Sequence, residues 1–549
     1  MGLHLPDAIR LYAGERAHWP ALTCAGRTIR YAELDSRTNR LARALLAAAP
    51  AGSRIGFLTR TRGEAGEILI AAAKAGLVTV PLNWRLAVPE LTGIARDAGL
   101  RVLIADTEFL EAADAVRAVL PDLLLIGTEA GTEAGTEAGT EPGFGTATAT
   151  GTGTGTATRT GTGGPAGPDT APGYEAWLAA HPDDDPGRGG EADADEVFLQ
   201  IYTSGTTGLP KGVLLTHRNF HADRAELDEY VWEAGSVALN ALPMFHVGGL
   251  GWLRLALTAG AHTLLVPEFA PGPVAETMER EGVTHAFLVP SVLQMLTALP
   301  GVDTRDFSGL RLIAYGAAPI TPVLLRRSME VFGCRFMGKY GLTETGGTVS
   351  RLPPEDHAAD GPRERLLASV GRPRRGVEVT IVDTLTGLPV PPGAVGEIRV
   401  RSRHNTPGYW NRPEETAALY DAEGRLCTGD GGYLDEDGLL FLTDRVKDMI
   451  VSGGENVYPT EVEAVLAEHP AVLEVAVVGV PDEVWGEAVA AVVVLREGAV
   501  RPTERELIDF TRPSLASYKK PRRVRFVPEL PRNAAGKILK RALREPGHP

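Results

Sequence analysis

Apolar and polar positions near the N-terminus predict helices that are each followed by a buried strand. The segment RYAELDSRTNRLARALLAAA (30–49) has apolar residues at helical spacing, and SRIGFLT (53–59) has the pattern of a buried strand. AGEILIAAAKAGLVTVPLNW (65–84) repeats this helix and strand, and LRVLIAD (100–106) adds another short strand. Alternation of this kind predicts an α/β body with parallel strands.

The alternation stops at Gly127, where repeated GTEA and GT units begin and lead into the acidic run HPDDDPGRGGEADADE. This stretch contains few large apolar side chains, so burial cannot offset the entropy lost on ordering it. We therefore expect residues 127–192 to form a disordered surface insertion, and the pattern indicates no function for it.

Regular patterning resumes with the strand VFLQIYT (197–203) and changes character near Asp444. From there a helical segment lies between two strand-like runs, which is typical of a compact α+β unit. We expect two domains, a large one over 1–444 and a small one over 445–549.

Length and charge narrow the class of protein. A chain of 549 residues is too long for one simple core, and its net charge of −15 argues against a dedicated nucleic-acid binder. From Arg512 onward, however, eleven Lys and Arg face only two acidic residues, Glu529 and Glu545. A basic segment on an acidic body favours a small anionic ligand near that end, although a solvated helical face is the simpler interpretation.

The spacing of the cysteines and the length of the apolar runs indicate the cellular compartment of the protein. Cys24, Cys334 and Cys427 are far apart, without metal-ligand spacing, and fit a reducing compartment. The N-terminus lacks an apolar signal core, and no apolar run reaches the ~18 residues that span a bilayer. We expect a cytoplasmic protein that does not insert stably into a membrane.

The stretch YTSGTTGLPKG (202–212) is the strongest candidate for chemistry. A strand ends here in hydroxyl residues and glycines, whose N–H and O–H donors suit a polyphosphate, and Lys211 adds a cation. The loop is not a Walker A motif, because Gly212 follows the lysine where that motif has Ser or Thr. An ordinary glycine-rich turn is the alternative.

The complete string resembles the phosphate loop of the adenylate-forming superfamily, which includes acyl-CoA synthetases, luciferases and peptide-synthetase adenylation domains. Further segments resemble motifs of this family in the family's order, over nearly the whole chain except the insertion. They are PMFHVGG (243–249), YGAAP (315–319), KYGLTET (339–345), TGD (428–430), DRVKDMIVSGGENVYPTEVE (444–463) and PRNAAGKILKR (531–541).

The resemblance implies a site for each step of acid activation by ATP. The implied ATP and AMP site consists of Thr203, Ser204, Gly205, Thr206, Thr207, Gly208, Lys211, Gly316, Ala317, Ala318, Tyr340, Gly341, Thr343, Glu344, Asp430, Arg445 and Lys537. Among these, Tyr340 would stack on adenine and Asp430 would hold the ribose. Glu344 and Thr203 would hold Mg²⁺. The implied acyl pocket contains His246, Val247, Gly248 and Lys339.

These roles make chemical sense. A carboxylate that attacks the α-phosphate of ATP must overcome the repulsion between two anions. Positive charge and donors placed where negative charge develops would lower that barrier, and Lys537, Lys211, Thr203 and a magnesium held by Glu344 would supply them. His246 belongs to the same implied catalytic set.

The small domain would serve the second half-reaction, in which a thiol takes the acyl group and AMP leaves. In this family it rotates about a hinge, here Lys447, after the adenylate has formed. Rotation would withdraw Lys537 and present Ser452, Gly453 and Gly454, where glycine lets a pantetheine arm pass close to the backbone. Lys519, in the basic segment SYKKPRR, would attract the phosphates of coenzyme A.

Lys339 departs from the family pattern, because the residue before the motif tyrosine is often small. In malonyl-CoA synthetases an arginine at the equivalent place meets a second carboxylate. Lys339 would then recognise a dicarboxylate or another polar acid. The alternative is that Lys339 points away from the pocket.

The resemblance does not decide which thiol accepts the acyl group. An AMP-forming acid–CoA ligase is our first prediction, with ATP, Mg²⁺ and coenzyme A as its cofactors and a carboxylic acid as its partner. Transfer to the phosphopantetheine of an acyl carrier protein is the second. A non-catalytic scaffold that kept the fold is the third, and retention of Lys211, Glu344, Asp430, Arg445 and Lys537 together counts against it.

Overall fold

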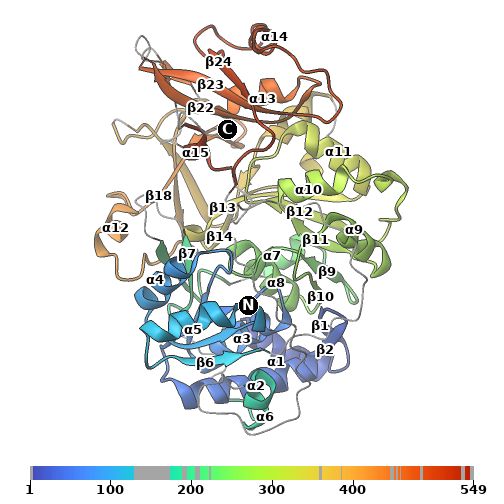
Figure 1. Cartoon of the computed structure of the whole chain (residues 1–549), viewed down its shortest axis with the longest axis vertical. Coiled ribbons are helices and arrows are strands. Elements are labelled where there is room, and N and C mark those ends of the chain that lie inside the picture. The colour runs from blue at the N-terminus through green and yellow to red at the C-terminus, as the bar shows by residue number, and fades with distance from the viewer. Residues whose placement is uncertain are drawn as a thin grey trace, which may run out of the picture.

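The computed structural model describes residues 4–128, 173–187, 194–203, 210–221, 224–357, 361–384, 386–445, 450–452, 455–457, 459–482, 486–532 and 538–544. A large body contains the N-terminal part of the chain, and a smaller C-terminal unit lies at one end of it (Figure 1). This arrangement confirms the expected mixed α/β fold class. The domain boundary at 444/445 remains a prediction, because the residues directly after Arg445 lie outside the described ranges.

A six-stranded sheet contains the strands expected near the N-terminus. Its order is β6-β5-β3-β4-β7-β8, parallel except for the antiparallel pair β7–β8. The strands are β3 (Arg54–Leu58), β4 (Val78–Pro81), β5 (Leu100–Ala105), β6 (Leu124–Gly127), β7 (Val197–Thr203) and β8 (Lys211–Thr216).

A nine-stranded sheet forms the second layer, in the order β15-β14-β13-β12-β11-β9-β10-β1-β2. Its centre is parallel, and antiparallel strands close both edges. The strands are β1 (Pro20–Cys24), β2 (Arg27–Arg30), β9 (Val237–Asn240), β10 (His262–Leu265), β11 (His285–Leu288), β12 (Leu312–Gly316), β13 (Arg335–Leu342), β14 (Gly347–Leu352) and β15 (Arg372–Pro373).

Helices cover both sheets and fill the space between them (Figure 1). Helix α3 (Gly63–Ala75) is buried along its whole length, as its nearly continuous apolar sequence GEAGEILIAAAKA requires. The other helices of the body are α1 (Leu5–Glu15), α2 (Tyr31–Ala48), α4 (Val88–Ala98), α5 (Leu110–Val119), α6 (Tyr174–Ala179), α7 (Arg224–Glu229), α8 (Val247–Thr258), α9 (Pro271–Arg280), α10 (Pro290–Thr297), α11 (Pro322–Phe332) and α12 (Pro413–Ala418), with short 3₁₀ turns at 107–109, 302–304, 343–345, 354–356 and 361–368.

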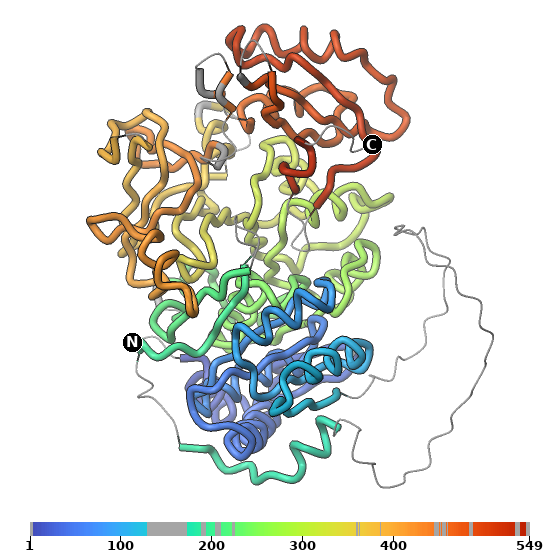
Figure 2. The backbone as a smooth tube through the Cα atoms, turned by 60° about the vertical axis from the view of Figure 1, so that its left-hand side comes forward, coloured from blue at the N-terminus to red at the C-terminus, as the bar shows by residue number. Residues whose placement is uncertain are grey.

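Two smaller sheets complete the chain. An antiparallel sheet at the side of the body contains β16 (Val377–Val382), β17 (Gly396–Ser402), β18 (Leu426–Leu434) and β19 (Leu440–Arg445). The C-terminal unit contains β20 (Ile450–Ser452), β21 (Glu455–Val457), β22 (Val472–Asp482), β23 (Gly486–Leu495) and β24 (Arg523–Phe526), with α13 (Pro459–Ala467), α14 (Glu504–Phe510) and α15 (Lys540–Arg544). Figure 2 shows this unit on the body.

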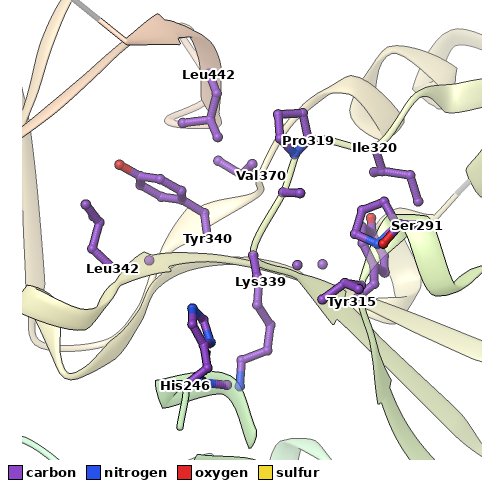
Figure 3. Close-up of a pocket in the computed structure, with 18 of the residues that line it drawn as sticks. His246, Ser291, Tyr315, Pro319, Ile320, Lys339, Tyr340, Leu342, Val370 and Leu442 are labelled. Atoms are coloured by element: carbon purple, nitrogen blue, oxygen red, sulfur yellow. Dashed lines mark hydrogen bonds between the residues drawn. The ribbon is translucent and has the colours of Figure 1, made fainter. Parts of the chain in front are cut away.

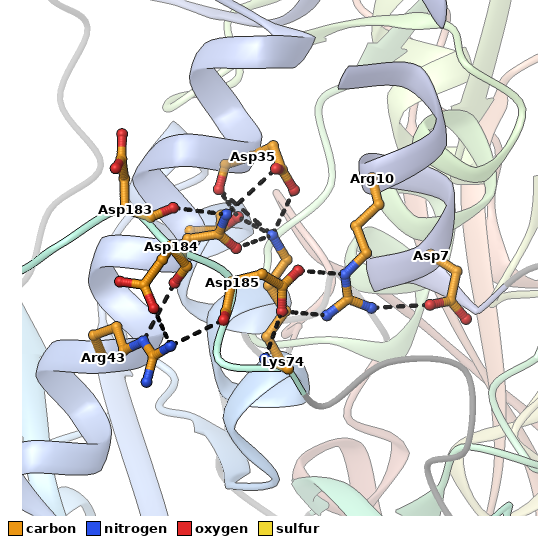
Figure 4. Close-up of polar contacts among 11 residues, drawn as sticks. Asp7, Arg10, Asp35, Arg43, Lys74, Asp183, Asp184 and Asp185 are labelled. Carbon is orange, nitrogen blue, oxygen red and sulfur yellow. Dashed lines mark hydrogen bonds and ion pairs between the residues drawn. The ribbon is translucent and has the colours of Figure 1, made fainter. Parts of the chain in front are cut away.

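The expectation of a disordered insertion over 127–192 is wrong for residues 173–187. Helix α6 buries Tyr174 against the body, and its hydroxyl donates to Glu67 Oε2 over 2.7 Å. The aspartates that follow meet a row of arginines on α1 and α2 (Figure 4). Asp185 accepts from Arg10 Nε over 2.6 Å, and Asp184 pairs with Arg43. Their partners lie about 140 or more residues earlier in the chain, so the local acidic composition did not reveal them.

Among the described residues, no helix combines the length and apolar character needed to cross a membrane.

Candidate active site

A cavity of about 2700 Å³ lies where the body meets the C-terminal unit. Segments far apart in the sequence contribute to its wall, including β7, β8, β12, β13, β18 and α8. The sequence-predicted residues that line it are Thr203, Lys211, His246, Val247, Gly248, Gly316, Ala317, Ala318, Lys339, Tyr340, Gly341, Thr343, Glu344, Asp430 and Lys519. The structure therefore brings all of these motif residues to one cavity.

The strands on either side of the glycine-rich loop hold its two ends together. Thr203 at the end of β7 is the register partner of Lys211 at the start of β8. The Lys211 ammonium lies 5.2 Å from the centre of the Tyr409 ring. The intervening Ser204, Gly205, Thr206, Thr207 and Gly208 lie outside the described residues, so their part in phosphate binding remains a prediction.

Tyr340 and Asp430 are joined across the cavity by a hydrogen bond. The Tyr340 hydroxyl donates to Asp430 Oδ2 over 2.9 Å, although the residues are 90 positions apart. Asp430 belongs to β18, where its backbone amide donates to Thr428 Oγ1. This bond brings the residue expected to stack on adenine beside the residue expected to hold the ribose.

Glu344 is held by a residue that the sequence did not indicate. The hydroxyl of Tyr409 donates to Glu344 Oε1 over 3.0 Å. Burial and the Glu344 charge both raise the pKa of Tyr409, so the phenol remains a donor. The same ring faces Lys211, and Tyr409 therefore connects the phosphate loop to the expected magnesium ligand.

The segment that carries Tyr409 is fixed by Asp97 of α4. The indole of Trp410 donates to the Asp97 carbonyl over 2.9 Å, and Arg412 Nη2 donates to its carboxylate over 2.9 Å. Tyr202, directly before Thr203, donates to the same carboxylate over 2.6 Å. Asp97 thus connects Tyr202, at the start of the phosphate loop, with the segment that carries Tyr409, the partner of Glu344.

The expected adenine turn depends on a close approach of two strands. Gly316 on β12 pairs with Lys339 on β13, and a Cβ at Gly316 would lie 2.4 Å from the Lys339 carbonyl oxygen. Ala317 then adopts a positive φ of 66°. A side chain at Gly316 would push the two strands apart, so glycine is required here.

His246 forms the N-terminal cap of α8. Its Nδ1 accepts a hydrogen bond from the Gly248 amide over 3.0 Å, which leaves the ring proton on Nε2. Burial lowers the pKa of His246 and favours the neutral ring. A Cβ at Gly249 would lie 2.3 Å from the Pro243 carbonyl oxygen, so the glycines of the motif permit this tight entry.

Lys339 points from β13 into the cavity, toward His246 (Figure 3). Its Nζ lies 5.3 Å from the centre of the Tyr230 ring and 5.6 Å from that of Phe287. The alternative in which Lys339 points away from the pocket is therefore wrong.

The cavity offers a suitable set of ligands for a nucleotide-bound Mg²⁺. Among the described residues, no cluster of three or more His, Cys, Asp or Glu side chains forms a protein-only metal site. Mg²⁺ on a nucleotide needs only one or two carboxylates, because phosphates and waters complete its octahedron. Glu344 and the Thr203 hydroxyl fit that requirement, since both line the cavity beside the phosphate loop.

The structure only partly describes the expected residues of the C-terminal unit. Lys537, Lys447, Gly453, Gly454 and the Arg445 side chain lie outside the described residues. Arg532 and Ile538, which bracket the segment containing Lys537, line the cavity and form a β-bridge with each other.

Two of the residues that we expect to contact coenzyme A lie in the described part of the structure. Lys519 Nζ lies 2.6 and 2.7 Å from the two carboxylate oxygens of Glu461, which compensate its charge. Ser452 is only 1% exposed within β20 and is not part of the described cavity wall. Their contact with coenzyme A remains a prediction.

Two family models cover most of the chain. The AMP-binding enzyme model matches residues 10–410, and the AMP-binding enzyme C-terminal domain model matches residues 461–537.

Individual relatives match along almost the full length. The fatty acid–acyl-carrier-protein ligase ScoC of Streptomyces coeruleorubidus is 40% identical over 532 residues, covering 96% of this chain and 93% of the relative. The feruloyl-CoA synthase of an Amycolatopsis species is 36% identical over 530 residues, covering 96% of each chain. The ATP-bound crystal structure of MatB from Rhodopseudomonas palustris superposes with a TM-score of 0.82 at 29% identity, covering 99% of this chain and 98% of MatB.

The fold and the cavity define an adenylate-forming enzyme with a small C-terminal domain, an acid–thiol ligase of the AMP-forming kind. This chain belongs to the AMP-binding enzyme family.

Proposed function

We propose that this enzyme joins a carboxylic acid to AMP, releasing pyrophosphate, and then transfers the acyl group to the thiol of coenzyme A. The observation that carries the proposal is the meeting of Lys211, Tyr340, Glu344 and Asp430 in one cavity, with tyrosine hydroxyls fixing both carboxylates. The family membership supports the same reaction.

In the first step, a carboxylate oxygen of the acid attacks the α-phosphorus and the bond to the β-phosphate breaks. Lys211 and the donors of the 203–208 loop hold the phosphates, and Lys537 stabilises the charge that develops on them. Tyr340 and Asp430 hold adenine and ribose, with Gly316, Ala317 and Ala318 forming the adenine turn. His246 and Lys339 line the acyl side.

Glu344 and Thr203 would hold Mg²⁺, which would compensate the charge of the departing pyrophosphate. Tyr409 holds one oxygen of the Glu344 carboxylate through its 3.0 Å hydrogen bond.

In the second step, a thiol attacks the acyl carbonyl and AMP leaves. We place rotation of the C-terminal domain about Lys447 between the two steps, which brings Ser452, Gly453, Gly454 and Lys519 to the pantetheine. Free coenzyme A is our preferred acceptor. A carrier-protein phosphopantetheine is the second candidate, supported by the name and 40% identity of ScoC.

We also propose that the enzyme is cytoplasmic. Cys24, Cys334 and Cys427 are all free thiols, which suits a reducing compartment.

The test incubates the purified chain with ATP, Mg²⁺ and single acids from a panel of fatty, aromatic and dicarboxylic acids. Each reaction runs alone, with coenzyme A and with a phosphopantetheinylated carrier protein. We expect acid-dependent AMP and an acyl-CoA product by mass spectrometry. Acyl-carrier product without acyl-CoA would assign the second candidate. No AMP with any acid would contradict the proposal.

A further inference from the structure

One turn of β18 bulges out of its pairing with β17. Glu397 of β17 pairs with Gly431 of β18. The next register pair joins Arg399 and Cys427, so one residue of β17 lies opposite three residues of β18, 428–430. A bulge of this kind interrupts the ladder of backbone hydrogen bonds and redirects the side chains of the longer strand. We call residues 428–430 the ribose turn, because its last residue is the aspartate expected to hold the ribose.

Contacts from β17 hold the ribose turn in place of the interrupted ladder. The Thr428 hydroxyl donates to the Ile398 carbonyl over 2.6 Å and accepts from the Asp430 amide over 3.1 Å. Gly429 has a positive φ of 68°, a conformation that favours glycine. Its amide donates to Glu397 Oε1 over 3.2 Å. The middle amide of the turn is thus held by a side chain.

Glu397 is itself fixed by an ion pair. Arg399 Nε donates to Glu397 Oε2 over 3.2 Å, and both side chains are only 15% exposed. Arg399 Nη1 donates in turn to Asp421 Oδ2 over 2.9 Å, and the same oxygen accepts from Arg425 Nε over 2.7 Å. Because Oε2 of Glu397 is held by Arg399, its Oε1 remains directed at the Gly429 amide.

These contacts continue to the nucleotide side of the cavity. Asp430 follows Gly429 directly, and its Oδ2 accepts from the Tyr340 hydroxyl over 2.9 Å. Glu397, Gly429, Asp430 and Tyr340 all line the cavity. A carboxylate accepts well from hydroxyl groups only within about 2.5–3.0 Å, so a small shift of the ribose turn would weaken its hold on the ribose.

A second cross-strand ion pair of the same sheet offers a comparison. Arg401 of β17 donates from Nη1 to Glu378 Oε2 of β16 over 3.2 Å, with side chains that are 50% and 57% exposed. Glu378 is not among the described residues that line the cavity. The two pairs share their chemistry and their distance, but only the Glu397 pair contacts the ribose turn.

We propose that Glu397 is a positioning residue for the ribose, whose carboxylate holds the ribose turn so that Asp430 meets the ribose hydroxyls. The inference rests on the proposed binding of a nucleotide in this cavity. Glu397 acts through Asp430 and not on the nucleotide itself. Moving its carboxylate should therefore weaken recognition of the ribose hydroxyls and leave recognition of adenine and phosphate nearly unchanged.

AMP and 2′,3′-dideoxy-AMP measure this recognition by binding, independently of catalysis. Each ligand is titrated calorimetrically into the full chain without acid or coenzyme A. Because the two ligands differ only in the ribose hydroxyls, the dissociation constant of dideoxy-AMP divided by that of AMP reports those hydroxyls alone. We expect this hydroxyl ratio to be about ten or more in the wild type, since hydrogen bonds to a charged group are lost.

Three variants separate the position of the acceptor from its charge, after circular dichroism has shown that each is folded. Glu397→Asp keeps the charge beside Arg399 but withdraws the acceptor from Gly429. Its hydroxyl ratio should fall below about three, with the affinity for dideoxy-AMP changed less than about twofold. Glu397→Gln keeps an acceptor oxygen at the original length and should retain at least about half of the wild-type ratio. Glu378→Asp is the matched control and should leave both dissociation constants unchanged.

A double variant tests whether Glu397 acts through Asp430. If it does, Glu397→Asp combined with Asp430→Ala binds AMP as well as Asp430→Ala alone. Additive losses of AMP affinity would overturn the inference. An undiminished hydroxyl ratio in Glu397→Asp, equal weakening of both ligands in that variant, or a ratio in Glu397→Gln as low as in Glu397→Asp would also overturn it.

Pyrophosphate release with the acid panel distinguishes this inference from the proposed function. The expected hydroxyl ratios without acid-dependent pyrophosphate release would leave the inference standing and contradict the proposed function. Acid-dependent release by a wild type that binds AMP and dideoxy-AMP equally would support the proposed function and overturn the inference.

Discussion

The hydroxyl of Tyr409 lies 3.0 Å from the carboxylate of Glu344, and the Tyr409 ring faces the ammonium of Lys211. One side chain thus contacts both the expected magnesium ligand and the cation of the phosphate loop. Asp97 anchors the neighbouring Trp410 and Arg412 by hydrogen bonds, and these contacts help to position Tyr409.

Replacing Tyr409 by Phe should weaken the use of Mg-ATP. The change keeps the ring beside Lys211 but removes a hydrogen bond to a charged group, worth about 1.5–3 kcal/mol. We expect kcat/KM for Mg-ATP to fall roughly tenfold to a hundredfold and more Mg²⁺ to be needed for half-maximal rate. Tyr12→Phe is the control, since its hydroxyl donates to the Thr258 carbonyl in the body. An unchanged magnesium requirement in Tyr409→Phe would contradict the assigned role.

Replacing Tyr340 by Phe should raise the KM for ATP with little effect on kcat. The ring that would stack on adenine remains, but Asp430 loses the donor that holds it at 2.9 Å. We expect an increase of roughly tenfold to a hundredfold, because a hydrogen bond to a charged group contributes about 1.5–3 kcal/mol. Tyr340→Leu removes the ring as well and should cost more. Steady-state kinetics with ATP as the varied substrate measure both, and equal effects would show that the ring does not contribute to nucleotide binding.

The recognition of a second carboxylate that the sequence predicts for Lys339 should depend on the protonation of this side chain. Burial lowers the pKa of Lys339 to about 8, with Arg374 and Arg254 repelling its charge and Glu226 attracting it. An ammonium binds the second anion below this pKa, and the neutral amine present above it does not. The ratio of kcat/KM for a diacid to that for its monoacid should therefore fall as the pH rises through about 8.

The other titratable groups near Lys339 should not produce the same pH dependence of the kcat/KM ratio. The charged and titratable groups that face Lys339 from the elements around it are Glu226, Tyr230, His246, Arg254, Arg351 and Arg374. Over pH 7–9 Glu226 stays ionised, and His246 and Tyr230 stay neutral. The Lys339→Met variant should give a flat ratio, and a persisting decline would assign the titration to another group.

The buried ion pair between Arg37 of α2 and Glu67 of α3 should stabilise the body more than the exposed pair between Arg37 and Glu175 of α6. Glu67 is only 1% exposed, accepts from Arg37 Nε over 2.7 Å and also accepts from Tyr174. Glu67→Gln leaves the arginine without its buried partner and should lower the free energy of unfolding by about 3 kcal/mol. Glu175 meets the same arginine at 2.8 Å with a side chain that is 36% exposed. Glu175→Gln should therefore cost less than about 1 kcal/mol. Urea titration followed by fluorescence compares the two, and equal costs would contradict the burial argument.

Local sequence signals predicted much of this molecule. Apolar periodicity located α2, β3, α3, β4 and β5, because each of these elements buries a face that its own residues define. Family motifs predicted the residues of the cavity wall, since the chemistry of each motif is contained in a few consecutive positions.

Features that depend on distant partners were not predictable in this way. Tyr409 acts on Glu344 from 65 positions away, and nothing in its local sequence indicates a carboxylate partner. Glu226, Arg254 and Arg374 each look like ordinary surface charges until the fold buries them together. The order of residues 173–187 likewise depends on arginines of α1 and α2 that lie far away in the sequence.

The most direct test of the central claim compares AMP release by the wild type and by Glu344→Gln. Both are assayed with ATP, Mg²⁺, coenzyme A and the best acid of the panel, after circular dichroism has shown that the variant is folded. The site described here predicts AMP release that requires the acid in the wild type and is lowered a hundredfold or more in the variant. Equal rates in the two proteins, or AMP release that does not require an acid, would contradict it.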